Sequence, residues 1–395
     1  MAQVNLNTRE LKDFMHHMIN NNREIQSKGL VPVAINIIGD HGLGKTTVIQ
    51  QLAMEEGLDF VKINLGQLDE ISDIVGFPVK EFQVSKTTSE GNKTKWVTEM
   101  EAERAIKDPT VKLTGLKRTT YCPPEWIAGK SNGGILLLDD FTRGSQAMMQ
   151  AVMDLIYTQE YYSWSLPKDW HICLTSNPDN GNYHVTALDG AQTSRFISCN
   201  LKFDVNCWAE WAESANIDGR AINFVLKHKE IIGDKTNPRS ITTFFNSISS
   251  FKNFEDNLPM IQMIGEGSIG PEVTTLFTMF IHNKLDKLVS PEDLMKDSVS
   301  VDSVVNQLRD AIGEGADYRA DIASILATRI VNYSVNFSKT NKVTDNMIKK
   351  LESVITEDVL TIDLKYMFVR NLMKDAKQKF QKLLLNADVL DITTK

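Results

Sequence analysis

Residues 39–46 read Gly-Asp-His-Gly-Leu-Gly-Lys-Thr, which matches the pattern G-x-x-x-x-G-K-[ST] at every position. The apolar run 33–38 precedes this stretch, and a helix-like segment, 46–54, follows it. A buried strand, a glycine-rich loop and a helix in this order form the setting that a phosphate-binding P-loop requires. The sequence therefore predicts phosphate-binding residues at Gly39, Asp40, His41, Gly42, Leu43, Gly44, Lys45, Thr46 and Thr47.

Each part of this loop has a physical role in phosphate binding. The glycines allow backbone N–H groups to turn inward, and the helix N-terminus adds partial positive charge. We expect Lys45 to reach the β- and γ-phosphates and the Thr46 hydroxyl to bind Mg²⁺. The alternative is a glycine-rich turn that binds nothing, which is disfavoured because a buried-strand run ends at the first glycine. We expect ATP and Mg²⁺ as cofactors, although such motifs read phosphates and do not distinguish adenine from guanine.

The composition is that of an ordinary globular protein, with 42% hydrophobic and 24% charged residues among 395. A net charge of −8 disfavours wholesale binding to a nucleic-acid backbone, although a local basic channel remains compatible with it. The four cysteines form no C-x-x-C pair, so a zinc site is not expected. The sequence shows no membrane-length apolar run and no signal peptide, which favours the cytoplasm, or the host cytoplasm for a phage protein.

The order of apolar runs predicts an α/β fold. Strand-like runs at 33–38, 59–65, 134–138 and 170–175 alternate with helical patterns, notably 7–20 and 145–157. Near-continuous apolar strands of this kind indicate a parallel sheet with helices on both faces. From about residue 205 onward the patterns are helical only, first to about residue 251 and then from 258 to 395. The apolar stripe on the final Lys-rich helical segment is interpreted as core packing rather than as a binding face.

Two regions depart from this alternation. Residues 80–120 are polar and strand-like around a plausible hairpin turn at 89–92. Residues 157–168 are rich in aromatic side chains and end near Pro167. Both are treated as inserts in the α/β domain.

Polar residues follow the second and third central strands. Asp139 and Asp140 end the run 135–138, where Asp139 is expected to support Mg²⁺ and Asp140 to activate the attacking water. The alternative is a pair of solvated acids at a strand end. Asn177 follows the run 172–175 and is suited to bridge the γ-phosphate and the water, although Asn-Pro is also a common turn former.

Two arginines complete the candidate site. Arg195 follows eighteen residues after Asn177, and Arg239 opens a helix in the helical region. Taken alone, Arg195 is compatible with an ordinary surface position. Arg239 is compatible with a plain first-turn residue as well as with a contact to phosphate.

Taken in order, these segments resemble a known family. Residues 39–46, 135–140, 174–178, 187–196 and 237–240 resemble the Walker A, Walker B, sensor 1, arginine-finger and sensor 2 elements of AAA+ ATPases. More narrowly, residues 68–78 and 139–144 are similar to segments of the MoxR and dynein-related branch. Residues 121–126 and 166–170 resemble pieces of bacterial and phage relatives whose partner carries a von Willebrand factor A domain. The resemblance covers about residues 8–300.

The resemblance implies roles and boundaries. It implies a P-loop NTPase (AAA+) α/β domain at 1–200, an α-helical lid at 201–257 and a further helical region at 258–395. By this resemblance, Asn177 is expected to act as sensor 1 and Arg239 as sensor 2. Arg195 is expected to be the arginine finger that enters a neighbouring subunit's site. Arg143 becomes an interface or lever residue. Family members usually have glutamate where this chain has Asp140. Because aspartate is one methylene shorter, its carboxylate would lie further from the attacking water, and slow hydrolysis is therefore a hypothesis.

The expected function is therefore a ring-forming ATPase, in the family most often hexameric, that remodels a protein partner in a chaperone-like way. A von Willebrand factor A domain protein is one expected client. One alternative is a nucleic-acid-directed motor or restriction-type NTPase, suggested by lysines in the first insert and aromatic residues in the second. The other is a nucleotide-gated scaffold that turns over slowly, which Asp140 supports.

Overall fold

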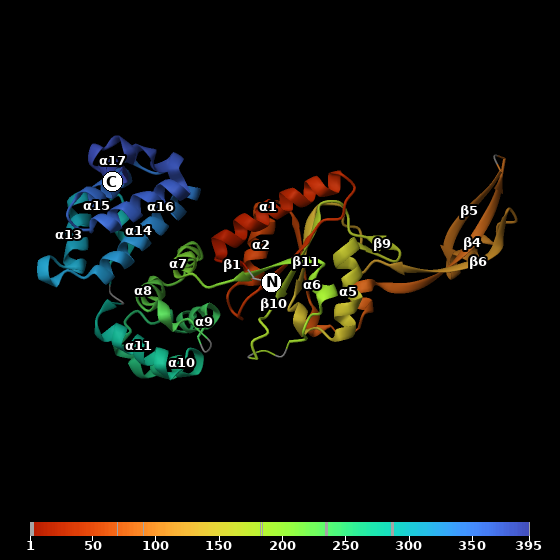
Figure 1. Cartoon of the computed structure of the whole chain (residues 1–395), viewed down its shortest axis with the longest axis horizontal. Helices are drawn as coiled ribbons and strands as arrows, with labels where there is room; N and C mark the ends of the chain where they lie inside the picture. Colours follow the sequence, from red (N-terminus) through yellow and green to blue (C-terminus); the bar gives the residue numbers. More distant parts are fainter. Residues whose placement is uncertain are drawn as a thin grey trace. The chain divides into compact units, whose positions relative to one another are not determined.

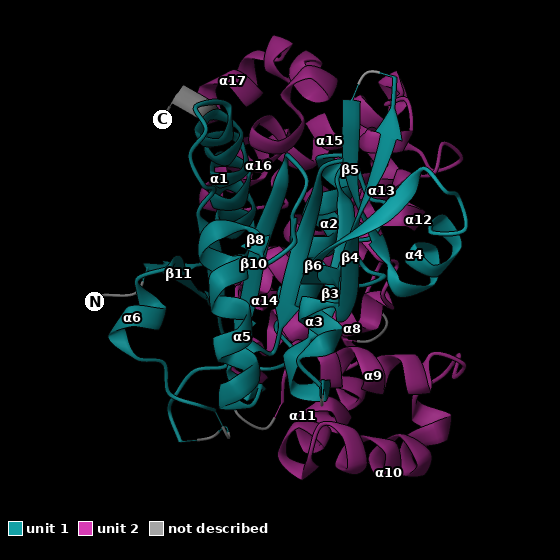
Figure 2. Ribbon diagram, turned by 90° about the vertical axis from the view of Figure 1, so that its right-hand side faces the viewer, with its two compact units in different colours: residues 1–202 teal, residues 203–395 magenta. Residues whose placement is uncertain are grey.

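The computed structural model of the chain describes residues 4–68, 70–89, 91–181, 183, 185–233, 236–285 and 288–394. The chain forms two compact units, residues 1–202 and 203–395, coloured separately in Figure 2. The first unit is α/β and the second is α-helical. The predicted fold class, a parallel α/β sheet followed by helices, is thereby confirmed.

A six-stranded parallel sheet forms the centre of the first unit. Its strands lie in the order β1 (Val4–Leu6), β11 (Phe196–Leu201), β2 (Ala34–Ile38), β10 (Trp170–Ser176), β7 (Gly134–Asp139) and β3 (Asp59–Asn64). All five neighbouring pairs are parallel. The four strands predicted from apolar runs are therefore confirmed, and β1 and β11 add two strands that the sequence patterns do not single out. In β11 only Phe196, Cys199 and Leu201 are buried, so it lacks a continuous apolar run.

Helices cover both faces of this sheet. The helices α1 (Thr8–Ser27) and α2 (Lys45–Glu55) pack on one face, against Ile35, Ile37 and Leu137. The helices α3 (Ser72–Val75) and α5 (Gln146–Thr158) pack on the other, against Leu136 and Leu138. α1 begins as predicted, because Asn7 and Glu10 form a reciprocal capping box. It continues seven residues beyond the predicted end at residue 20, to Ser27.

The first insert folds as a separate three-stranded antiparallel sheet, here called the arm (residues 77–122). Its strands are β4 (Phe77–Thr88), β5 (Gly91–Thr98) and β6 (Val111–Cys122), with β4 in the centre and α4 (Glu99–Ala105) before β6. Figure 1 shows the arm extending away from the parallel sheet. β4 and β5 pair from Thr88 and Gly91 onward, which confirms the predicted hairpin, although Glu90 in its turn lies outside the described residues.

The second insert is a short hairpin, β8 (Glu160–Tyr161) and β9 (Trp164–Ser165), here called the aromatic hairpin. Gln159, Tyr162 and Asp169 have positive φ, which marks the hairpin's base and turn as sharp reversals. The side chain of Trp164 donates a hydrogen bond to the carbonyl of Val75 at 2.8 Å, immediately before the arm. Tyr162 stacks on Tyr121 with ring centroids 5.1 Å apart. The aromatic hairpin is therefore held by contacts to the root of the arm, the place where β4 begins and β6 ends.

The second unit contains helices throughout its described residues. They are α7 (Val205–Ser214), α8 (Gly219–Lys227), α9 (Pro238–Ile248), α10 (Leu258–Ser268), α11 (Pro271–His282), α12 (Pro291–Met295), α13 (Val301–Ile312), α14 (Ala320–Thr340), α15 (Asp345–Thr356), α16 (Ile362–Phe380) and α17 (Ala387–Thr394). The short α6 (Gly190–Thr193) belongs to the first unit.

One hydrophobic core runs through this second unit, from Trp208 to Val389. The predicted subdivision into a lid at 201–257 and a region at 258–395 is therefore not marked by a break in packing, and it stays a prediction. On α16 the predicted apolar stripe is core packing, because Phe368, Leu372 and Phe380 are fully buried. Tyr366 is the exception in that stripe and is 43% exposed. Among the described helices, none combines the length and apolar character needed to cross a membrane.

Candidate functional site

The loop after β2 has the backbone that its glycines predict. Gly42 and Gly44 have φ of 76° and 85°, in the left-handed region that favours glycine. Gly44 is also the N-cap of α2, so the N–H groups of the first turn face the loop. At Gly39 a Cβ atom would lie 2.9 Å from the carbonyl oxygen of Leu201, so a side chain has no room there. The loop therefore has the shape that allows backbone N–H groups to surround an anion.

Lys45 connects this loop to the end of β10. Its ammonium group lies 2.5 Å from the carbonyl oxygen of Gly39 and 3.0 Å from that of Asp40. It also donates to Asn177 Oδ1 at 3.3 Å, and the residue is only 8% exposed. The cation that was predicted to bind phosphate is thus held within the loop, beside the residue predicted to act as sensor 1.

Thr46 and Asp139 lie next to each other, as a shared metal site requires. The Thr46 hydroxyl is 3.1 Å and 3.3 Å from the two carboxylate oxygens of Asp139. The Thr175 hydroxyl donates to the same carboxylate at 2.5 Å, and the Lys62 ammonium lies 2.9 Å from it. Burial alone would raise the pKa of Asp139, but these hydrogen bonds and the Lys62 charge lower it below its ordinary value. Asp139 is therefore ionised at neutral pH.

These oxygens fit a magnesium ion. Mg²⁺ prefers hard oxygen ligands and usually takes only one or two from the protein, with nucleotide phosphates and water completing its shell. The hydroxyl of Thr46 and the carboxylate of Asp139 supply such ligands. In the part of the chain that the structure describes, no group of three or more His, Cys, Asp or Glu side chains is arranged to hold a metal by itself. The donor set thus suits a cation that is shared with a bound nucleotide.

Asp140 has an unusual backbone conformation directly after β7. Its φ of 51° and ψ of 41° lie in the left-handed region, which aspartate tolerates better than most residues. Its backbone N–H donates to the Thr175 hydroxyl at 3.0 Å. The carboxylate accepts a hydrogen bond from Asn177 Nδ2 at 3.4 Å and lies 3.7 Å from the Arg143 guanidinium. The predicted water-activating acid is therefore oriented by three neighbours.

Two contributors to the site do not stand out in the sequence. Thr175 accepts from the N–H of Asp140 and donates to Asp139, so one hydroxyl positions both acids. The Tyr183 hydroxyl contacts the P-loop, at 3.0 Å from His41 Nδ1 and 3.1 Å from Asp40 Oδ1. The one signal that could have indicated Thr175 is a hydroxyl side chain one residue before the end of β10. Of the remaining loop residues, Leu43 packs on the core and Thr47 is exposed on α2.

Arg195 lies at the amino-terminal end of the parallel strands, whereas the P-loop lies at their carboxyl-terminal end. It precedes β11, and Phe196 pairs with Ala34, the first residue of β2, whereas the P-loop follows Ile38 at the other end. Five residues of strand span about 16 Å. The Arg195 guanidinium instead lies over the Tyr157 ring, 5.5 Å from its centroid, and 4.0 Å from Asp154 Oδ1. The structure therefore does not bring Arg195 to the other predicted site residues of the same chain.

Arg239 belongs to the second unit. It is exposed in the first turn of α9, where Asn237 caps the helix and Pro238 occupies its first position. A contact between Arg239 and a phosphate in the first unit would join the two units, so this role stays a prediction.

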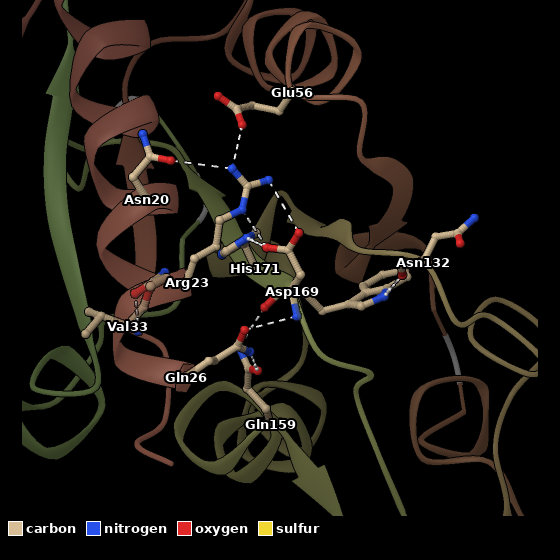
Figure 3. A network of polar contacts seen from close by, with 11 residues as sticks. Asn20, Arg23, Gln26, Val33, Glu56, Asn132, Gln159, Asp169 and His171 are labelled. Carbon is tan, nitrogen blue, oxygen red and sulfur yellow. Dashed lines mark hydrogen bonds and ion pairs between the residues drawn. The ribbon is translucent and has the colours of Figure 1, made fainter. Parts of the chain in front are cut away.

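A polar cluster lies where α1 approaches the start of β10 (Figure 3). Arg23 donates from Nε to Asp169 at 2.8 Å and from Nη1 to Glu56, just beyond the end of α2, also at 2.8 Å. His171 Nε2 lies 3.0 Å from the same Asp169 carboxylate, and burial lowers the pKa of His171. Three elements far apart in the sequence are thus joined by ion pairs, which no local pattern revealed.

The same cluster fixes the base of the aromatic hairpin. The side chain of Gln26 accepts from the N–H of Asp169 at 3.0 Å and donates to Gln159 Oε1 at 3.4 Å. Gln159 in turn donates to the carbonyl of Trp170 at 3.2 Å. Both positive-φ residues that flank the hairpin, Gln159 and Asp169, are therefore hydrogen-bonded to α1.

No protein-family model and no curated protein sequence matches the chain. Among solved structures, it is similar to a RuvB variant from Thermotoga maritima, with 15% identity, 76% of this chain and 84% of that chain covered, and a TM-score of 0.37. It is also similar to a putative ATPase from Cytophaga hutchinsonii, with 14% identity, coverage of 94% and 88%, and a TM-score of 0.28. Identities and TM-scores this low leave the function to be argued from the site itself.

Proposed function

We propose that this chain is an AAA+ ATPase of the MoxR type, which assembles into a ring and couples ATP binding and hydrolysis to remodelling of a protein partner. The observation that carries the proposal is the separation of Arg195 from the P-loop across the length of β2. With Arg195 proposed as the arginine finger, its distance from the P-loop of its own chain means that a second subunit would complete each site. A head-to-tail interface closes into a ring when the rotation between neighbouring subunits returns to its start, and a ring of six subunits is proposed.

Within one site, the proposed roles follow the contacts. Lys45 and the N–H groups of the loop would bind the phosphates, and Asp140 would orient the attacking water together with Asn177. A magnesium ion held by Thr46 and Asp139 would neutralise charge on the phosphates. Arg195 of one subunit and Arg239 of the helical unit would complete the site, the first across the ring interface.

The two inserts are the elements that we propose to move during the nucleotide cycle and to contact the client. The aromatic hairpin is attached to the root of the arm by the Trp164–Val75 hydrogen bond and by Tyr121–Tyr162 stacking. It is attached to α1 through Gln26 and Gln159. A shift of α1 and α2 during the nucleotide cycle would therefore move hairpin and arm together. A protein client, for which a von Willebrand factor A domain is proposed, would be engaged at these inserts.

Assembly in solution tests this proposal. We expect the Asp140→Asn variant with ATP and Mg²⁺ to form a closed oligomer, measured by native mass spectrometry, because it would bind ATP without hydrolysing it. ATPase activity of the wild type should rise more than linearly with protein concentration, since a lone subunit lacks Arg195 in its site. A monomer with full ATPase activity would overturn the ring.

A second candidate function, a nucleic-acid-directed motor, is favoured by the charge of the arm. Its three strands carry two, two and three lysines or arginines, against one acidic residue, Glu81. Strand register puts five lysines on one face: Lys80, Lys86, Lys93, Lys95 and Lys117. The same face carries the buried Val84 and Val97, which pack against Ala102 of α4, and Lys86 pairs with Asp108 at 3.2 Å, so the lysines surround an apolar centre. Lys80 and Lys117 lie over the ring of Phe82, at 5.5 Å and 5.4 Å from its centroid. Such a cationic surface suits a phosphate backbone.

A salt titration separates the two candidates. If the arm binds single-stranded DNA, the affinity will fall steeply with salt, and Lys80→Glu with Lys117→Glu will weaken it further. Lys28→Glu, which changes an exposed lysine at the C-terminal cap of α1 that is already paired with Glu24, is the matched control. Absence of binding at low salt would remove the nucleic-acid function and leave protein remodelling.

A further inference from the structure

Lys62 is a residue to which the expected nucleotide chemistry gives no role, yet it contacts the proposed metal ligand. It lies on β3, the edge strand of the sheet, and pairs in register with Leu137 of β7. Asn64 lies directly opposite Asp139. Because alternate residues of a strand share a face, Lys62 is a diagonal neighbour of Asp139, within reach of a lysine side chain. Its ammonium lies 2.9 Å from Asp139 Oδ2.

The orientation of Lys62 is not explained by its place on an edge strand. Lysines on edge strands commonly point into water, where they discourage pairing with other chains. Lys62 instead shares a face with Leu137, which packs toward α2, and it reaches the carboxyl end of the sheet. There it contacts a carboxylate whose side chain is only 11% exposed. Of the donors to that carboxylate, Thr46, Thr175 and Lys62, Lys62 alone carries a charge.

Two cations could therefore pair with the Asp139 carboxylate, namely the Lys62 ammonium and a divalent metal ion. A divalent cation bound at Thr46 and Asp139 would stand close to the Lys62 ammonium, and two positive charges at one carboxylate repel each other. The Lys62 side chain is 43% exposed, so it can turn into water without opening a cavity in the core. Lys62 and the metal thus compete for the same charge.

We propose that Lys62 is a positioning residue that competes with Mg²⁺ for Asp139 and so sets the metal affinity of the nucleotide complex. This inference rests on the proposed function, because it assumes that a nucleotide binds at the P-loop. The Lys62 ammonium neutralises the charge of Asp139, and it leaves the carboxylate when a divalent cation binds beside the phosphates. Lys62 thereby weakens the binding of Mg²⁺ to Asp139 and Thr46 alone. A bound nucleotide would add phosphate ligands to the metal, so metal binding would depend on the nucleotide.

The test measures metal binding rather than turnover. Mn²⁺ is titrated into the full-length chain saturated with ADP, and free Mn²⁺ is followed by its electron paramagnetic resonance signal. We expect Lys62→Met to tighten Mn²⁺ binding by about two- to fivefold, the range that corresponds to the loss of a partly exposed ion pair. Lys62→Arg, which keeps the charge, should resemble the wild type. With EDTA present, Lys62→Met should not bind ADP more tightly than the wild type.

Lys130→Met is the matched control. Lys130 pairs with Asp59 at the other end of β3, at 3.1 Å, and the two lysines are similarly exposed, although Asp59 is 38% exposed against 11% for Asp139. Its substitution therefore removes a lysine–aspartate pair from the same strand, far from the P-loop. It should leave Mn²⁺ affinity unchanged. Unchanged or weaker Mn²⁺ binding in both Lys62→Met and Lys62→Gln, with wild-type thermal stability, would overturn this inference alone. A wild type that binds no ADP would overturn the proposed function and the inference together.

Discussion

Gly76, at the root of the arm, provides a sharp test of the fold. It has φ of 89° and ψ of 176°, a combination that is essentially restricted to glycine. A Cβ atom there would lie 1.8 Å from the carbonyl oxygen of Cys122 and 3.3 Å from Pro124. Since Cys122 pairs with Phe77 at the start of the arm, the two strands must separate to admit a methyl group.

Gly76→Ala combines two costs. Backbone strain contributes about 1–3 kcal/mol, and the steric overlap contributes a further 1–3 kcal/mol. Gly115 on β6 is the matched control, because its φ is 86° but a Cβ atom there would meet nothing within 4 Å. Gly115→Ala should cost only the strain of a left-handed residue, about 1–2 kcal/mol. The two variants differ mainly in the contact with Cys122.

Scanning calorimetry measures the difference. For a unit of 202 residues, each kcal/mol lowers Tm by about 2–4 °C, so Gly76→Ala should melt several degrees below Gly115→Ala. Tryptophan fluorescence should also change, because Trp126 and Trp164 donate hydrogen bonds to the carbonyls of Asp73 and Val75, just before Gly76. Equal melting temperatures for the two variants would refute the close approach of Gly76 and Cys122.

Two further predictions concern the site and its support. Asp140→Glu should raise kcat for ATP hydrolysis by up to about a hundredfold, since the added methylene brings the carboxylate nearer the water; a glutamate variant no faster than the wild type would show that the left-handed backbone already compensates. Burial holds the pKa of His171 below 6.5, so the unfolded chain takes up the proton first as the pH falls. The stability that neutral His171 contributes is therefore complete above pH 6.5 and declines below it, whereas Asp169, whose pKa is also lowered, matters only at more acidic pH. Tm measured from pH 7 to pH 5 should fall less steeply in His171→Gln, and an identical slope would contradict this assignment.

The sequence predicted those parts of the fold that depend on local patterns. Buried parallel strands such as β7 are continuous apolar runs, and the P-loop is defined by its glycines, so both were found. The helix α4 was missed, although Thr98 and Glu101 form a capping box at its start that is visible in the sequence.

The missing parts of the site depend on contacts between distant residues. Arg23 and Asp169 are 146 positions apart, and the contact of Lys62 with Asp139 follows from the register of β3 on β7. A positive φ at Asp140 is equally hidden, because most aspartates adopt ordinary conformations. Such features arise only once the strands are aligned.

The central claim is that each nucleotide site is shared by two subunits, and a mixing experiment tests it most directly. Lys45→Met removes nucleotide binding but keeps Arg195, whereas Arg195→Ala keeps the P-loop but removes the finger, so neither variant alone should hydrolyse ATP. Coexpressed in equal amounts, they should recover about a quarter of the wild-type activity per site, since about one interface in four pairs an intact P-loop with an intact Arg195. Full activity of Arg195→Ala alone, or co-assembled rings without any recovery, would contradict the shared site.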